Sequence, residues 1–154
     1  MGRIGDVRLM AKMVDVGDKD VVRREATAEG LLVLKTSTVK AIASGTIKKG
    51  DVVTVSKLAG IQAAKSTSST IPLCHQIPLM SAEVEVLPEG DRLRCRCTVK
   101  ADYRTGVEME ALVGVTVALL NAWDMVKYLE KDESGQYPDT RITDVKVISK
   151  KKGG

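Results

Sequence analysis

The most constraining feature of the sequence is a pair of alternating segments joined by a short turn at residues 88–91. In both segments every second residue is apolar, which is typical of strands with one buried face. The first segment carries acids on its other face and the second carries arginines, so the solvent sides should attract each other. The pattern therefore predicts an antiparallel hairpin. Its apolar residues are Val84, Val86, Leu93, Cys95, Cys97 and Val99, and its charged residues are Glu83, Glu85, Arg92, Arg94 and Arg96.

Two further strands and three helices are expected around this hairpin. The patterns predict a strand over 26–35, a short helix over 36–45, a helix over 52–65, a loop over 66–80, a long amphipathic helix over 107–131 and a strand over 142–148. This order matches the ferredoxin-like, split βαβ plan, an α+β sandwich whose antiparallel sheet has helices on one face. We expect one domain over 1–154, with a mobile segment at 1–20 and a basic tail at 149–154.

The counts of histidine and cysteine exclude several kinds of site. One histidine cannot make a two-histidine zinc site, and three cysteines cannot make a paired disulfide framework. We therefore expect no metal held by the protein. No apolar run approaches 18 residues and no signal-peptide pattern opens the chain, which predicts a cytoplasmic protein with no membrane partner.

The charge balance leaves two classes of ligand open. Lysine and arginine exceed the acids by 24 to 20, giving a net charge of +4, and several lysines gather at the end of the chain. This surplus suits nucleic acid or a small polyphosphate, although a charge run is usually a solvated surface. Sheets that bind RNA stack bases on aromatic residues of their strands, and Tyr103 is the only aromatic residue near the hairpin. A nucleic-acid-binding module without catalysis therefore remains the alternative, and we do not expect nucleic acid as a partner.

Two segments are hard to explain by packing alone. The only histidine, His75, lies between Pro72 and Pro78 in the predicted loop, and Glu108 and Glu110 stand at the start of the long helix. A lone histidine is more often an ordinary hydrogen-bonding residue, and acids at a helix start interact favourably with its dipole. The two prolines nevertheless favour a histidine held in a fixed position. Both interpretations stay open at this point.

Several segments, taken in order, resemble the family of cyclic pyranopterin monophosphate synthases of molybdenum cofactor biosynthesis. They are residues 13–16, 48–52, 60–65, 71–75, 105–112 and 124–127, so the resemblance covers about 13–150. It implies a lyase that rearranges cyclised dihydro-GTP into a pterin bearing a cyclic phosphate, with release of pyrophosphate. The chain departs from the family where Gln76 and Ile77 precede Pro78, at the polar insertion 131–140, and at lysines 150–152.

The resemblance also assigns roles to residues of this sequence. It implies catalytic roles for Asp124, Lys127 and Lys49. It also implies seven substrate contacts, at Leu73, Cys74, His75, Met109, Glu110, Glu108 and Lys65. Lysines suit a reaction that releases pyrophosphate, because the developing charge must be neutralised. The spacing of Asp124 and Lys127 alone fits an ordinary surface ion pair, and the nearby acid favours a charged Lys127 that donates or binds phosphate. No protein-bound cofactor is expected, although Mg²⁺ could accompany the triphosphate.

The positions of two of these acids predict an assembly. Glu110 and Asp124 stand 14 positions apart on one predicted helix, which corresponds to about 21 Å of rise. A single pterin-sized pocket cannot reach both from the same chain. If both act on one substrate, the site lies between protomers, and the resemblance implies dimers assembled into a hexamer.

Overall fold

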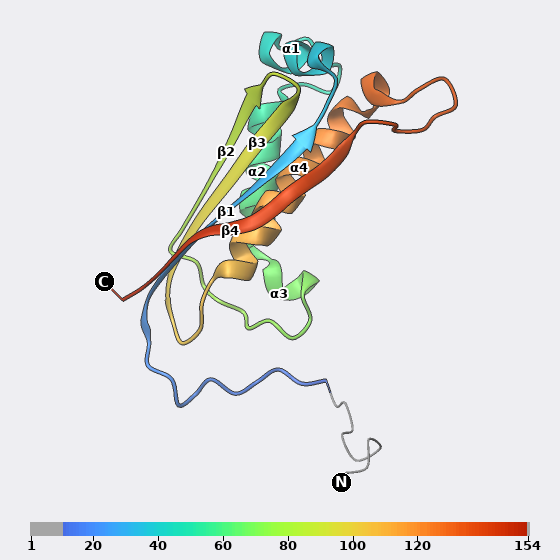
Figure 1. The fold of residues 1–154 in the computed structure, drawn as a ribbon. Helices are drawn as coiled ribbons and strands as arrows, with labels where there is room; N and C mark the ends of the chain where they lie inside the picture. The colour runs from blue at the N-terminus through green and yellow to red at the C-terminus, as the bar shows by residue number, and fades with distance from the viewer. Residues whose placement is uncertain (1–10, 154) are drawn as a thin grey trace.

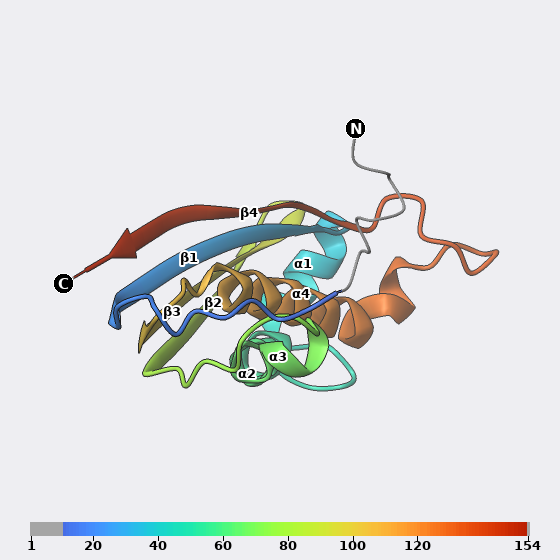
Figure 2. The same ribbon diagram turned by 90° about the horizontal axis from the view of Figure 1, so that it is seen from below.

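A four-stranded antiparallel sheet in the order β2-β3-β1-β4 carries the helices on one face, as Figures 1 and 2 show. The computed structural model describes residues 11–153. The strands are β1 (Val22–Val33), β2 (Ser81–Glu89), β3 (Arg92–Tyr103) and β4 (Arg141–Lys152), and the helices are α1 (Thr36–Ser44), α2 (Val52–Lys65), α3 (Thr67–Thr70) and α4 (Glu108–Glu130). The predicted split βαβ plan is confirmed.

The predicted hairpin is confirmed as β2 and β3, and its register explains the alternation. Val84 pairs with Cys97 and Val86 with Cys95, and all four residues are buried under the helices. Because side chains alternate across a sheet, this register turns the arginines of β3 towards the open face. The hairpin therefore supplies two of the four strands of the sheet and the part of the core beneath them.

The predicted attraction between the charged faces of the hairpin is confirmed in register, because Glu85 lies opposite Arg96 and Arg94 contacts Glu89 at 3.2 Å. The shorter bonds of the two arginines, however, go to β1: Glu29 accepts from Arg94 at 2.8 Å and from Arg96 at 2.6 Å. Since β3 lies between β1 and β2, its arginines have acids on both sides. The alternation within the hairpin does not reveal Glu29, the more enclosed of these acids.

Helix α4 is the core helix, and glycines let its neighbours approach closely. A Cβ on Gly60 of α2 would stand 2.9 Å from the Gly114 carbonyl oxygen, and a Cβ on Gly114 would stand 2.6 Å from Cys97 Sγ. Glycine is therefore required where α2, α4 and β3 meet. By length and composition α4 could cross a membrane, but more than half of its most apolar stretch is buried inside the fold.

The ends of the chain differ from expectation. Strand β4 extends to Lys152 and pairs with β1, so residues 149–152 belong to the sheet and are not a tail. The predicted loop 66–80 contains the short helix α3. Of the predicted mobile segment, residues 1–10 lie outside the described residues. In the remainder, Arg104 donates to the carbonyl oxygens of Gly17 and Lys19 at 2.8 and 2.7 Å, which attaches this stretch to the body of the fold.

Candidate active site

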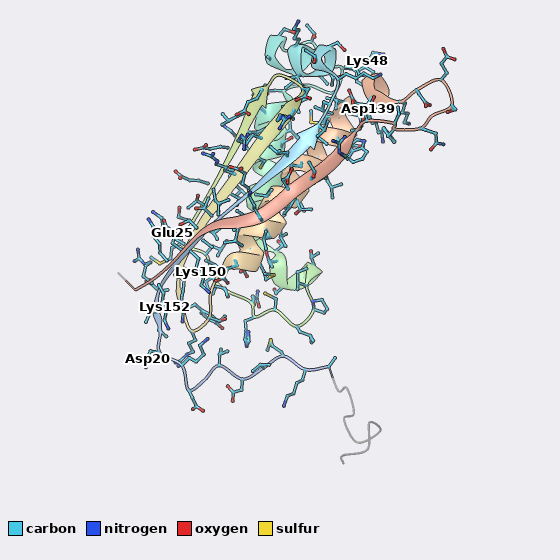
Figure 3. The ribbon with its side chains drawn as sticks, in the orientation of Figure 1. Asp20, Glu25, Lys48, Asp139, Lys150 and Lys152 are labelled. Atoms are coloured by element: carbon cyan, nitrogen blue, oxygen red, sulfur yellow. The ribbon has the colours of Figure 1, made fainter. Side chains whose placement is uncertain are left out.

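Helix α4 places the predicted site residues at its two ends. Its first turn carries Glu108, Met109 and Glu110, and its second half carries Asp124 and Lys127. Figure 3 shows the same separation in the residues around them, because Lys48 and Lys150 lie at opposite ends of the molecule. The structure therefore forms two groups, here named the Glu110 group (Cys74, Glu108, Glu110 and Lys150) and the Asp124 group (Lys49, Asp124 and Lys127).

The centre of the Glu110 group is a buried carboxyl with too few partners. Glu110 is 2% exposed, and its Oε1 has no hydrogen-bond partner. Its Oε2 lies 3.9 Å from Cys74 Sγ, which is long even for a sulfur donor. Burial, aided by the nearby charge of Glu108, raises the pKa of Glu110, while the helix backbone opposes the shift. A favourable contact with the helix dipole does not explain such a residue.

Two other members of the Glu110 group, Cys74 and Glu108, are partly buried, whereas Lys150 is exposed. Burial, followed by the charge of Glu110, raises the pKa of the Cys74 thiol, which keeps the thiol neutral. Glu108 is paired with Lys150 Nζ at 2.8 Å. Burial is the largest single influence on Glu108 and would raise its pKa, but the hydrogen bond from Lys150, a backbone hydrogen bond and the charges of Lys150 and Arg24 together lower the pKa. The first turn of α4 thus carries one carboxyl whose pKa is raised and one whose pKa is lowered.

The remaining predicted substrate contacts lie around this group but are not all brought together. Leu73 and Met109 are 46% and 43% exposed, unusual values for large apolar side chains. His75 lines a cavity of about 420 Å³ with residues 13–17, Tyr103 and Arg104. Lys65 lines a different cavity of about 610 Å³ beside residues 76–82. Within one chain, His75 and Lys65 therefore face separate spaces.

In the Asp124 group, two lysines share one carboxylate. Lys49 Nζ lies 3.0 Å from Asp124 Oδ2, and Lys127 Nζ lies 2.9 Å from Oδ1. The bonds from Lys127 and then Lys49 lower the pKa of Asp124, and Asp124 in turn raises the pKa of Lys127. All three groups are therefore charged at neutral pH, and together they carry one surplus positive charge. Lys127 is suited to binding an anion or donating a proton, not to acting as a base.

The structure adds residues that the sequence patterns did not single out. Tyr128 accepts a hydrogen bond from the Lys48 amide at 3.1 Å. Glu130, 1% exposed, accepts bonds from the Lys35 amide and from the hydroxyls of Thr38 and Thr140. A tyrosine and a glutamate on an amphipathic helix look like ordinary surface residues in sequence. Only their distant partners reveal that they join α4 to the segment that carries Lys49.

Among residues 11–153, no three or more histidine, cysteine, aspartate or glutamate side chains gather in a way that could hold a metal ion. The buried Glu110 has only a neutral thiol beside it, and Asp124 is occupied by two ammonium groups. Whether Mg²⁺ enters with a phosphate-bearing ligand stays a prediction.

Known proteins are similar to this chain over nearly its whole length. The MoaC family model matches residues 13–153. A protein of Saccharolobus solfataricus named "Probable cyclic pyranopterin monophosphate synthase" is 55% identical over 91% of this chain and 94% of its own length. Proteins with the same name from Thermococcus kodakarensis and Aeropyrum pernix are each 54% identical, over 92% and 93% of this chain and 91% and 98% of their own lengths. The matched region contains both groups on α4, and the chain belongs to the MoaC family.

Proposed function

We propose that this protein is a cyclic pyranopterin monophosphate synthase of molybdenum cofactor biosynthesis. It acts as a lyase that rearranges cyclised dihydro-GTP into cyclic pyranopterin monophosphate and releases pyrophosphate. The observation that carries the proposal is the identity above one half, over more than nine tenths of the chain, with relatives of that name. The two groups on α4 supply side chains that such a reaction needs.

The Asp124 group is proposed to bind the phosphates and the departing pyrophosphate. Asp124 holds the ammonium groups of Lys49 and Lys127 close together, yet cancels only one of their two charges. All three side chains are about half exposed, so an anion can reach them. Cations that are already in place when charge develops on a leaving group lower the barrier, because little reorganisation is then needed.

The Glu110 group is proposed to handle protons at the ring system. Burial makes the Glu110 carboxyl a better proton donor near neutral pH than an exposed glutamate, which is fully ionised there. Its unpaired Oε1 is free to bond a ligand. The exposed Leu73 and Met109 offer apolar surface for a flat ring beside it. Cys74 and His75 then flank the ring, as the family resemblance implies.

We further propose that the active site is completed by a second copy of the chain. Asp124 and Glu110 stand 14 residues apart on α4, a rise of about 21 Å for an α-helix. A pterin nucleotide cannot engage both from one chain if its ring lies at Glu110. The Glu110 group of one protomer would face the Asp124 group of its partner, in dimers that assemble further into a hexamer. The large exposed apolar side chains beside Glu110 support an interface there.

The nucleic-acid alternative finds no support in the open face of the sheet. Tyr103 is the only aromatic residue in the four strands, and Arg94 and Arg96 are already paired with Glu29. A base-stacking platform needs exposed aromatic residues, and phosphate binding needs free cations. The described strands offer no such row of aromatic residues, and the two central arginines of this surface are not free.

The direct test is incubation of the purified protein with cyclised dihydro-GTP, with pyrophosphate release and pterin product both measured. We expect turnover by the wild type and a loss of at least about 100-fold in kcat/KM for Lys49→Ala, on the scale of removing a group that stabilises developing charge. Lys40→Ala, at an exposed lysine on α1, is the matched control and should retain activity. No product from the correctly folded wild type would overturn the proposal.

A further inference from the structure

The segment that carries Lys49 is a short loop laid along one face of α4. It runs from Gly45, where α1 ends, to Gly50, just before α2. Both glycines have positive φ, 73° and 117°, so the chain turns sharply at each end. Between them Ile47 is buried and fixes the middle of the loop in the core. These features fix the path of the loop, but they do not by themselves fix the end of a long lysine side chain.

Two consecutive residues of this loop contact two residues one turn apart on α4. The Lys48 amide donates to Tyr128 Oη at 3.1 Å, and Lys49 Nζ lies 3.0 Å from Asp124 Oδ2. Asp124 and Tyr128 are four residues apart, so their side chains lie on the same face of the helix. Lys48 Nζ also lies 5.1 Å from the centre of the Tyr128 ring. Tyr128 therefore holds the loop next to the point from which Lys49 reaches Asp124.

We propose that Tyr128 is a positioning residue, whose hydroxyl holds the Lys48 backbone and thereby keeps the Lys49 ammonium beside Asp124. The inference rests on the proposed role of Lys49 in binding the phosphates. A lysine side chain loses much rotamer freedom when its end is fixed, and an anchored backbone removes the movement of its root. In chemical steps a small misplacement of a charged group lowers the rate strongly, because stabilisation depends on preset geometry.

Glu130 supports the same arrangement from the other end of the segment. Its carboxylate accepts from the Lys35 amide at 3.2 and 3.3 Å and from Thr38 Oγ1, which fixes the start of α1. The last two turns of α4 thus hold both ends of the stretch from Lys35 to Lys49. Glu130 is buried and its loss would disturb folding, whereas Tyr128 is 38% exposed and can be changed at a single atom. Tyr128 is therefore the position at which the proposal can be tested.

The test is Tyr128→Phe in the full-length assembled protein, which removes the hydroxyl and keeps the ring. We expect kcat for pyrophosphate release to fall about 10-fold, with KM changed less than about threefold, since the ligand still meets the same groups but the charge is less well placed. Hydrogen exchange should be faster at the Lys48 amide, which loses its acceptor. The matched control is Lys48→Met, which removes the ammonium above the ring and keeps the amide donor, and it should stay within twofold of wild type.

A kcat for Tyr128→Phe within twofold of wild type, or unchanged exchange at Lys48, would overturn the positioning role. A loss in Lys48→Met as large as that in Tyr128→Phe would assign the effect to the lysine side chain and also overturn it. Lys49→Ala measured alongside separates the two proposals. If Lys49→Ala is inactive and Tyr128→Phe is normal, only the positioning role fails, whereas an active Lys49→Ala removes the role of Lys49 on which it rests.

Discussion

The two ends of α4 keep their carboxyl groups in opposite states by opposite means. Glu110, 2% exposed and with one oxygen unpaired, has its pKa raised by burial. Asp124, whose side chain is 53% exposed, has its pKa lowered by two ammonium groups. One helix thus carries a carboxyl that is held closer to its neutral form than an ordinary glutamate and a carboxylate whose charge is stabilised. The environment, not the residue type, decides which chemistry each end can perform.

Neither group is explained by a contribution to folding. Exposed ion pairs such as those of Asp124 contribute little to stability, because water screens them. A buried polar atom without a partner, such as Glu110 Oε1, costs about 1–3 kcal/mol. One end of α4 therefore adds little stability and the other reduces it, which is the pattern expected where residues serve a reaction.

The largest expected effect comes from removing the charge at the Asp124 end. In Asp124→Asn the two lysines lose the carboxylate that holds them together, so they separate and the phosphates lose an ordered site. We expect kcat/KM to fall by about 10²–10³, while the free energy of unfolding changes little, because the ion pairs are exposed. Steady-state kinetics and denaturant unfolding measure the two effects. Asp102→Asn, at another exposed aspartate in an ion pair, is the control and should keep its activity.

Mixing two inactive variants tests whether the two ends of α4 act on the same substrate. Glu110→Ala and Asp124→Ala should each be inactive alone. When they are unfolded together and reassembled, random pairing leaves one intact site in each mixed dimer, so about a quarter of the wild-type activity should return. Absence of activity in mixed assemblies verified by mass spectrometry would contradict a site shared between protomers.

Much of this arrangement was predictable from local pattern, and the reason is physical. The alternation in the hairpin and the apolar stripe of α4 are set by burial on one face, which leaves a direct trace in sequence. The pairing of Asp124 with Lys127 follows from their spacing on a helix, and it is confirmed at 2.9 Å. The order of the elements then limits the fold to few alternatives.

The contacts that define the candidate site were not predictable in the same way. The bond from Lys49 to Asp124 joins residues 75 positions apart, and that between Cys74 and Glu110 joins residues 36 apart. Such pairs depend on how the helices lie on the sheet. Arg94 and Arg96 of β3 likewise pair with Glu29, because β1 lies next to β3 on the side opposite β2. The extension of β4 beyond its predicted end depends on its pairing with β1. The family resemblance named all four residues of the Lys49–Asp124 and Cys74–Glu110 pairs, but it did not say which of them contact each other within one chain.

A smaller effect, on stability, is expected when the buried carboxyl of Glu110 is replaced by an uncharged amide. Because the pKa of Glu110 is raised by folding, its ionisation destabilises the folded state, and stability is lost as the pH rises through the folded pKa. Glu110→Gln keeps the shape without the charge, so its stability relative to wild type should increase from pH 4.5 towards pH 8, by on the order of 1 kcal/mol. Urea unfolding across this range measures it. A difference that is constant with pH would mean that Glu110 is not held towards the neutral form.

The smallest expected effect is at Lys150, whose side chain is 60% exposed and pairs with Glu108. Lys150→Met should lower the free energy of unfolding at pH 7 by about 0.5 kcal/mol. The pairing lowers the pKa of Glu108, so it stabilises the fold above the unfolded pKa and is lost as the pH falls through the folded pKa. The deficit of Lys150→Met should therefore vanish in acid.

Lys151→Met is the matched control for that variant, because Lys151 is the next residue of β4 and pairs with Glu25 on the open face of the sheet at 3.3 Å. Both variants remove one exposed ammonium from one glutamate, so their stabilities should change alike. The two variants should differ in activity, because only Lys150 pairs with Glu108, which lies in the same turn of α4 as Glu110. We expect a loss of about threefold in kcat/KM for Lys150→Met, the scale of one weakly held charge, and none for Lys151→Met. Equal activities of the two variants would mean that Lys150 has only a structural role in β4 and takes no part in the reaction.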